Sequence, residues 1–264
     1  MSVLEPSARI IAVANQKGGV GKTTTTINLG AALCELGKRV LVIDLDPQGN
    51  ASTGLGVDPA LRSLSTYDLV LDGAPLSEIT QPTSVEHLII APATTDLSSA
   101  DIELGKQENR VFLLKDAFAE DGLDDYDIVL IDCPPSLNLL TVNAMVAAHS
   151  VLVPLQAEFF ALEGLSQLMK TLRNVRDSAN PSLRIEGVVL TMYDRRNNLC
   201  HLVEEDARET LGSLVYKTLI PRNVRLSEAP SFALSIFQYD RQSSGAVSYR
   251  SLAQELLSRE LTPA

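Results

Sequence analysis

A stretch of glycine, lysine and threonine, KGGVGKTT at positions 17–24, follows the apolar run RIIAVA at 9–14. Successive glycines let backbone N–H groups turn inward around phosphate oxygens, and a helix that begins near Lys22 aims its positive end at the same anion. A strand, a glycine-rich turn and a helix in this order predict a nucleotide-phosphate site. The additional lysine, Lys17, has no role in that minimal site and needs a separate explanation.

Three aspartates at the ends of apolar runs supply a second chemical signal. Asp44 and Asp46 end the run VLVIDLD on the same side of an extended chain, and Asp132 ends the run IVLID. Ligands of α/β sheets bind at the carboxyl ends of strands, and Mg²⁺ keeps several waters that acidic side chains can hold there. One such aspartate could equally be a turn or helix-cap residue. Three of them beside a phosphate loop favour a Mg²⁺–nucleotide site.

The elements that must position these residues alternate along the chain. Near-continuous apolar runs predict strands buried on both faces, as in a parallel sheet, at 9–14, 39–46, 87–93, 127–134, 150–156, 185–193 and 214–221. Helical patterns lie at about 22–36, 96–106, 109–120, 137–148, 161–178, 198–211 and 245–260. This order predicts an α/β fold with a single doubly wound, mostly parallel β-sheet flanked by helices. Because no repeat or linker divides the chain, we expect one domain over 1–264, with 1–8 as a flexible N-terminal extension.

Composition excludes several classes of protein. With 45% hydrophobic and 21% charged residues the chain is typical of a globular protein, and no apolar run reaches the length of about 18 residues that spans a membrane. The first residues carry no secretory signal, so we expect a cytoplasmic protein. Cys34, Cys133 and Cys200 form no CxxC pair, which argues against disulfides and cysteine-ligated metals. The net charge of −11 should repel nucleic acid on average, although a local basic patch can still bind it.

The phosphate loop departs from the usual GxxxxGK[ST] pattern, because Gln16 stands where the first glycine belongs. In that departure KGGVGKTT resembles the deviant P-loop, or deviant Walker A motif, of the partition and septum-site ATPase superfamily. The blocks QAEFFALEGLSQL, VVLTMYDRRN and IPRNVRLSEAPSF, at 156–168, 188–197 and 220–232, are similar to those of ParA/Soj-type partition ATPases. The resemblance therefore covers nearly the whole chain, and it implies a P-loop ATPase that binds ATP or ADP with Mg²⁺ and has weak intrinsic activity.

The resemblance also implies a role for each motif residue. Lys22 would reach the β- and γ-phosphates, and Lys17 matches the signature lysine that crosses a dimer interface to the nucleotide of the other subunit. Asp132 resembles the Walker B aspartate, Asp44 would support the outer shell of the metal, and Asp46 would orient the attacking water. The implied catalytic residues are thus Lys17, Lys22 and Asp46. The implied metal-site residues are Thr23, Asp44 and Asp132. The implied nucleotide-binding residues are Lys17, Gly18, Gly19, Val20, Gly21, Lys22, Thr23, Thr24, Pro221 and Asn223.

Two of these assignments have simpler structural alternatives. Lys17 could be a solvated loop lysine, although its flanking glycines favour a role at the nucleotide. Asn223 could be an ordinary turn residue instead of part of the adenine pocket.

Two further roles are expected near the site. The loop PQGN at 47–50 is expected to be flexible and to sense the γ-phosphate, and Glu158 is a candidate for the dimer face.

Basic residues recur in the final third of the chain despite its negative total charge. Because the loops after TMYD and IP should lie at the same edge of the sheet, Arg195, Arg222 and Arg225 could form one patch. The alternative is a set of scattered surface arginines paired with Asp194, Glu204 or Glu228. ParA/Soj-type ATPases use such a patch to bind double-stranded DNA without sequence preference in their ATP dimer. The resemblance therefore favours DNA binding with a steep salt dependence.

Other members of the superfamily fit the sequence less well. A membrane-associated MinD-like positioning ATPase, or another cargo-positioning ATPase, stays open as the alternative, but the C-terminal tail carries Glu255 and Glu260 and is not a cationic amphipathic helix. An iron–sulfur carrier would need paired cysteines.

We therefore expect a nucleoid-associated DNA-partition ATPase that forms an ATP-dependent homodimer without membrane contact. A ParB-type centromere-binding protein is expected to stimulate it, and the motif MYDRRN favours a chromosome over a plasmid as cargo.

Overall fold

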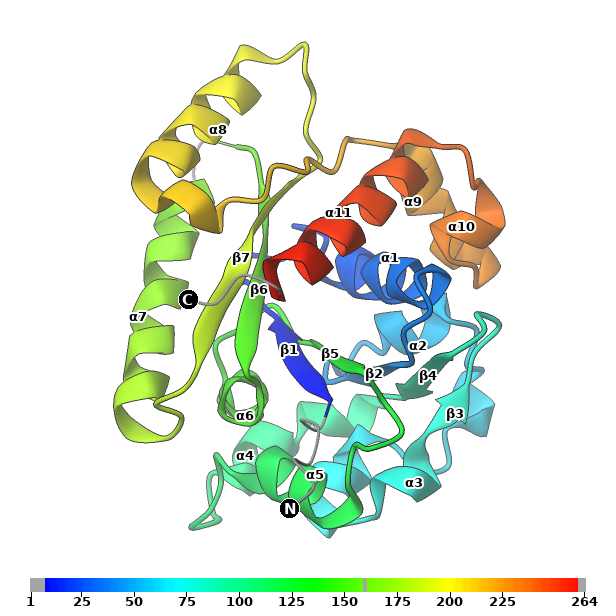
Figure 1. Ribbon diagram of the computed structural model, residues 1–264. Coiled ribbons are helices and arrows are strands. Elements are labelled where there is room, and N and C mark those ends of the chain that lie inside the picture. The colour runs from blue at the N-terminus through cyan, green and yellow to red at the C-terminus, as the bar shows by residue number, and fades with distance from the viewer. Residues whose placement is uncertain (1–7, 159–160, 261–264) are drawn as a thin grey trace, which may run out of the picture.

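A computed structural model describes residues 8–158 and 161–260 of the chain (Figure 1). Their strands are β1 (Arg9–Val13), β2 (Val40–Asp44), β3 (Gln81–Pro82), β4 (Leu88–Ala91), β5 (Ile128–Asp132), β6 (Ser150–Gln156) and β7 (Arg184–Thr191). They form one seven-stranded sheet in the order β3-β4-β2-β5-β1-β6-β7. Every pairing in it is parallel except that of the edge strand β3 with β4.

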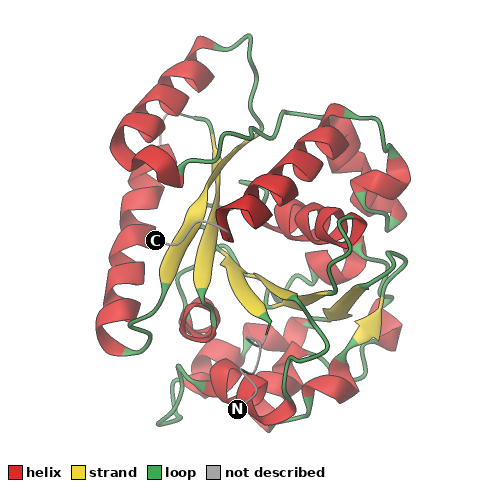
Figure 2. Ribbon diagram, in the orientation of Figure 1, coloured by secondary structure: helices red, strands yellow, loops and turns green. Residues whose placement is uncertain are grey.

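Helices cover both faces of this sheet (Figure 2). One face packs against α1 (Lys22–Glu35), α2 (Asn50–Gly54), α9 (Val224–Glu228), α10 (Ile236–Tyr239) and α11 (Ser244–Glu260). The other packs against α3 (Leu76–Ile79), α4 (Ala100–Leu104), α5 (Leu113–Asp121), α6 (Leu139–Ala147), α7 (Ala161–Ser178) and α8 (Asn198–Leu211). The predicted fold class, a doubly wound and mostly parallel sheet between two helical layers, is confirmed.

The near-continuous apolarity of the strands follows from this two-sided burial. In β1, Ile11 and Val13 face the layer of α1 and α11, whereas Ile10 and Ala12 face the opposite layer. Both faces of a central parallel strand are covered, so both sets of side chains must be apolar. The same arrangement leaves the carboxyl ends of the strands as the edge where polar residues can gather.

The predicted strand at 214–221 is wrong. Its residues make two isolated bridges, Val188 with Val215 and Tyr193 with Pro221, and no ladder. The segment is apolar because it is buried and not because it pairs with the sheet: Tyr216 and Ile220 pack in the core on the α11 side, and Val215 packs in the core on the other side. The antiparallel edge strand β3 was not predicted, since two residues give no periodicity to detect.

The long helices agree with the predicted ranges, and the short ones do not. The predicted helix at 96–106 is a 3₁₀ turn at Thr95–Ser98 followed by α4, and the one predicted at 109–120 begins only at Leu113. The short helices α2, α3, α9 and α10 fall in segments for which no helix was predicted. Residues 1–7 of the expected N-terminal extension lie outside the described residues, while Ala8 is buried.

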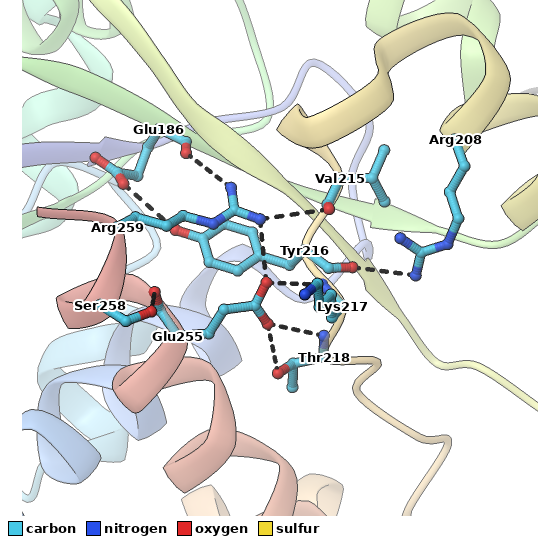
Figure 3. Close-up of polar contacts among 9 residues, drawn as sticks. All are labelled: Glu186, Arg208, Val215, Tyr216, Lys217, Thr218, Glu255, Ser258 and Arg259. Carbon is cyan, nitrogen blue, oxygen red and sulfur yellow. Dashed lines mark hydrogen bonds and ion pairs between the residues drawn. The ribbon is translucent and has the colours of Figure 1, made fainter. Parts of the chain in front are cut away.

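A polar cluster fastens the C-terminal half of α11 to the segment before Pro221 (Figure 3). Glu255 accepts the backbone N–H groups of Lys217 and Thr218 at 2.8 and 2.9 Å. The guanidinium of Arg259 lies 3.8 Å from the ring centroid of Tyr216. The cluster sets the position of α11, whose N-terminal half borders the candidate site.

Gly187 lies under this cluster and leaves no room for a side chain. A Cβ at this position would lie 2.4 Å from Tyr216 Cε2 and 2.8 Å from the carbonyl oxygen of Leu214. Since a backbone oxygen cannot yield easily, Gly187→Ala is expected to lower the free energy of unfolding by about 1–3 kcal/mol, measured by urea denaturation. Gly164→Ala in α7 is the control, because no described atom lies within 4 Å of its Cβ position. Equal stability of the Gly187→Ala variant and the wild type would contradict this packing.

Candidate functional site

The phosphate loop, residues 15–21, connects the end of β1 to α1. Gly19 and Gly21 have φ values of 75° and 87°, in the left-handed region that favours glycine. Gly21 is the N-cap of α1 and makes no side-chain cap, so the first N–H groups of the helix are available to an anion. The loop therefore has the backbone geometry of the predicted phosphate site.

The two lysines of the loop have different environments. The Lys22 side chain is buried, and its Nζ donates to the carbonyl oxygen of Lys17 at 3.0 Å. Burial lowers the pKa of Lys22, and the nearby Asp132 opposes that shift. Lys17 is partly exposed and forms an ion pair with Glu158. The loop thus holds one lysine inside the site and one at its rim, where Lys17 pairs within its own subunit.

Asp132 and Asp44 are directly opposite each other on the neighbouring strands β5 and β2. Asp132 accepts hydrogen bonds from the hydroxyls of Thr23, at 2.7 Å, and Thr26, at 3.1 Å. Burial, and then the charge of Asp44, raises the pKa of Asp132. A buried carboxylate whose ionised form is disfavoured in this way is stabilised when a cation binds beside it.

Asp44 lies at the same edge but is already engaged by the protein. Its carboxylate accepts the N–H and the hydroxyl of Ser52 at 2.8 and 2.7 Å, and the N–H of Asp46 at 3.2 Å. Asp46 is mostly buried and accepts the N–H of Gln48 at 3.0 Å. Asp44 therefore fixes the loop that carries Asp46, and the PQGN segment ends in Asn50, the first residue of α2.

Sequence reasoning missed several residues that shape the site. The Asn15 side chain donates to the carbonyl oxygen of Pro154 at 2.8 Å and accepts the N–H of Lys17 at 3.0 Å. Thr191, at the end of β7, donates to the carbonyl oxygen of Val20 in the phosphate loop at 2.8 Å. The position of Asn15 next to the loop could have revealed its role. Thr191 gives no sequence signal, because only the sheet brings it to the loop.

A cavity of about 320 Å³ lies beside the phosphate loop. Gly21 and Thr24 line it on one side, and Pro221 and Asn223 on another. The structure therefore brings the predicted base-binding residues to the predicted phosphate site. Asn223 also caps α9, because its Oδ1 accepts the N–H of Arg225 at 2.8 Å. Both interpretations of Asn223, as a pocket residue and as a turn residue, fit the geometry.

The structure brings together two of the three arginines that were predicted to form a basic patch. Arg195 and Arg222 line one open space of about 730 Å³, here called the arginine hollow, because the Tyr193–Pro221 bridge joins their loops. Arg225 lies on α9 outside this lining and forms ion pairs with carboxylates, as the alternative interpretation expected. The lining residues of the arginine hollow are Tyr193, Asp194, Arg195, Arg196, Leu219, Pro221, Arg222, Gln242, Ser244, Val247 and Ser248.

Two features are absent from the described residues, a cluster of metal-ligating side chains and a membrane-spanning helix. No group of three or more His, Cys, Asp and Glu side chains in 8–158 and 161–260 is arranged to hold a metal ion. In the same ranges no helix has the length and apolarity that crossing a membrane requires. A magnesium site at Asp132 would therefore need oxygen ligands from hydroxyls, water and phosphate as well as from carboxylates.

Comparison with known proteins places this site in a family. A family model described as an AAA domain matches residues 8–185. The chain is 55% identical over 253 residues to the chromosome partitioning protein ParA of Caulobacter vibrioides, covering 96% of this chain and 95% of that protein. The chain belongs to the ParA/Soj family of partition ATPases. Another ParA/Soj protein, the sporulation initiation inhibitor protein Soj of Bacillus subtilis, is 52% identical over 248 residues, which are 94% of this chain and 98% of Soj.

A solved structure that carries a different name shares the fold. It is described as cobyrinic acid a,c-diamide synthase from Mycobacterium smegmatis with bound ADP and magnesium. Its sequence is 40% identical, the match covers 96% of this chain and 95% of that one, and the TM-score is 0.83. The protein described here therefore shares its architecture with a protein whose structure contains ADP and magnesium.

Ser52 offers a test of how the site is held together. Its hydroxyl donates to Asp44 and accepts the N–H of Ala93 at 3.0 Å, and it is fully buried. Ser52→Ala leaves both groups without that partner, so the free energy of unfolding should fall by about 1–3 kcal/mol in urea denaturation. The exposed Ser213→Ala should change it by less than about 0.5 kcal/mol. If the two variants proved equally stable, the Asp44–Ser52 contact would not be holding the loop.

Proposed function

We propose that this ParA/Soj family member is a DNA-partition ATPase whose ATP-bound dimer binds duplex DNA and is reset by hydrolysis. One observation carries the proposal: the phosphate loop, the aspartates of β2 and β5, and the cavity lined by Pro221 meet at one edge of the sheet. The names of the relatives, which are partition proteins, support the same activity.

The residues at the edge of the sheet fit a magnesium nucleotide. The N–H groups of the loop and the buried Lys22 would hold the phosphates, and Thr23 with Asp132 would hold Mg²⁺ or its waters. Mg²⁺ supplies positive charge beside the phosphoryl group that is transferred. The adenine base would enter the cavity against Pro221. ADP and magnesium in the M. smegmatis structure support this assignment.

Hydrolysis requires a group that orients the attacking water, and we assign that role to Asp46. The N–H of Asp46 is tied to Asp44, so its position follows from the sheet edge itself. Asp46→Ala should bind ATP and dimerise, while turnover measured by phosphate release falls by at least about 100-fold, because water positioning is lost. Wild-type turnover in this variant would assign the role to another group.

Lys17 is proposed to join two subunits through ATP. It lies at the rim of the site, where only Glu158 pairs with it among the described residues, so it can exchange that partner for a nucleotide across an interface. Lys17→Ala should therefore stay monomeric with a non-hydrolysable ATP analogue in light scattering, and still bind nucleotide. The exposed Lys115→Ala is the control and should dimerise. A stable dimer of the Lys17→Ala variant would exclude this role.

The arginine hollow is the proposed DNA contact. Arg195 and Arg222 are exposed in a chain of net charge −11, so they form a local site for backbone phosphates. The function is tested by the anisotropy of random-sequence duplex DNA with Mg²⁺-ADP, Mg²⁺-ATP and a non-hydrolysable analogue at two salt concentrations. We expect salt-sensitive binding with the triphosphates only.

Arginine substitutions locate the contact in the same assay. Arg222→Ala should weaken binding and reduce the salt slope by about 1, because one phosphate contact is lost. Arg110→Ala, from the segment between α4 and α5, should bind as the wild type does. Binding in no nucleotide state would remove DNA from the proposed function.

The biological setting follows from the same proposal. A single ATPase domain over 1–264 that binds the nucleoid in its ATP state could move cargo marked by a ParB-type centromere-binding protein. That partner is proposed to stimulate hydrolysis and so release the DNA-bound dimer. The cytoplasm and the nucleoid are the corresponding locations.

A further inference from the structure

His201, near the start of α8, has a hydrogen-bond partner at each nitrogen of its ring. Its Nδ1 lies 3.0 Å from the hydroxyl oxygen of Tyr193, just after the end of β7, and the two rings meet edge to face. Its Nε2 lies 2.9 Å from the backbone carbonyl oxygen of Arg195. The imidazole therefore bridges the end of a strand and the turn that carries an arginine of the arginine hollow.

Both partners of His201 present it with a hydrogen-bond acceptor. The carbonyl oxygen of Arg195 can only accept. The Tyr193 hydroxyl has one hydrogen, and it donates this hydrogen to Glu204 Oε2 at 2.6 Å. Burial, and then the hydrogen bond to Glu204, raises the pKa of Tyr193 to about 12, so the hydroxyl is protonated at neutral pH. Its oxygen is left to accept a hydrogen bond from His201.

Glu204 fixes the direction of these bonds. Burial opposes its charge, but the hydrogen bonds from Tyr193 and Arg208 outweigh burial and lower the pKa of Glu204. Arg208 Nε donates to the other carboxylate oxygen at 2.9 Å. Glu204 is therefore ionised at neutral pH and has no hydrogen to give to Tyr193.

The geometry thus requires a hydrogen on both ring nitrogens of His201. A neutral imidazole has one N–H, so it would set a lone pair against either the Tyr193 oxygen or the Arg195 carbonyl. The imidazolium has two N–H groups, and the charge of Glu204 stabilises it. Glu205, four residues further along α8, is a second carboxylate on this side of the helix. His201 is exposed, so solvent protons reach it.

The Arg195 carbonyl belongs to a short turn, residues 194–197, that leads into α8. The N–H of Asn197 donates to the carbonyl oxygen of Asp194 at 3.0 Å, and the Asn197 side chain caps the helix. The bond from His201 ties the middle of this turn to the helix. The Arg195 side chain is exposed on that turn and lines the arginine hollow, so its position follows from the bond.

We infer that His201 is a positioning residue for DNA binding: its doubly protonated ring fastens the backbone of Arg195, which holds this arginine toward DNA phosphates at low pH and frees it as His201 loses a proton. The inference rests on the proposed function, because it takes Arg195 as a DNA contact. It needs no contact between His201 and DNA, and it does not involve the nucleotide cavity.

The sign of the pH effect follows from the ordering of the turn. Histidine titrates between about pH 5 and 8. At the lower end of that range Arg195 is already fastened, so DNA binding does not pay to order its turn. At the upper end the neutral ring must break one of its two contacts, and DNA binding becomes weaker. A single hydrogen bond of this kind corresponds to a factor of about 2 to 10 in affinity.

The test is the anisotropy of random-sequence duplex DNA with Mg²⁺ and a non-hydrolysable ATP analogue, at about pH 6 and about pH 8 and one salt concentration. The wild type should bind about 2- to 10-fold more tightly at the lower pH. His201→Gln should bind equally at both, with the affinity of the wild type at the higher pH. The control is His87→Gln, an exposed histidine beside Glu86, which should keep the wild-type ratio.

Tyr193→Phe separates the bond to Arg195 from the charge of His201. It keeps the imidazole and removes the oxygen that opposes Nδ1, so a neutral ring can donate from Nε2 to Arg195 without a conflict. Its affinity should therefore be nearly the same at both pH values, at the tighter level of the wild type at about pH 6. A merely structural loss would weaken binding at both values instead.

The remaining outcomes separate this role from the proposed function. Equal binding by the wild type at the two pH values would refute the role of His201 and leave the proposed function standing. The full pH ratio in His201→Gln would assign the effect to another group. The full ratio in Tyr193→Phe would show that the charge of His201 acts without the bond, which contradicts the inference. A wild type that binds DNA at neither pH would remove the proposed DNA contact, and the positioning role with it.

Discussion

Burial of charge at the carboxyl edge of the sheet is the constraint on which the rest of this structure depends. Asp132, Asp44 and Lys22 are all buried within one edge, where desolvation opposes each of their charges. Such groups persist only when hydrogen bonds and opposite charges compensate them. The threonine hydroxyls, Ser52 and the carbonyl oxygen of Lys17 supply hydrogen bonds of this kind.

The surrounding helices are placed to maintain this arrangement. The helix α1 carries Lys22, Thr23 and Thr26 on one turn, and its face toward α11 is apolar and buried. The Tyr249 hydroxyl of α11 lies 3.1 Å from that of Thr25, so α11 contacts α1 directly behind the phosphate loop. The polar cluster around Glu255 and Arg259 fastens the other end of α11. A helix distant in sequence therefore supports the first residues of the site.

The same geometry gives the two ligand spaces a common boundary. Short connections from the end of β7 and from the segment before α9 leave no room for a separate layer between the cavity and the arginine hollow. Pro221 and Arg222 line both spaces, so the nucleotide cavity and the arginine hollow have these two residues in common.

The sequence by itself determined the fold class, the phosphate loop and the aspartates at the strand ends. These follow from local physics, because buried parallel strands must be apolar on both faces and a phosphate loop needs glycines at positive φ. Family resemblance also predicted that Pro221 and Asn223 contact the nucleotide, and both residues line the cavity beside the phosphate loop. The predicted strand at 214–221 was wrong because apolarity alone does not distinguish pairing with a sheet from burial under a helix.

Only the tertiary structure decided which distant groups touch. Thr191 reaches Val20, Asn15 reaches Pro154, and Ser52 satisfies Asp44, all through strand register and loop paths that no local pattern encodes. It also separated Arg225, paired on α9, from Arg195 and Arg222 in the hollow. Charge in the sequence shows which residues can bind an anion, but whether a neighbour already neutralises them depends on packing across the whole chain.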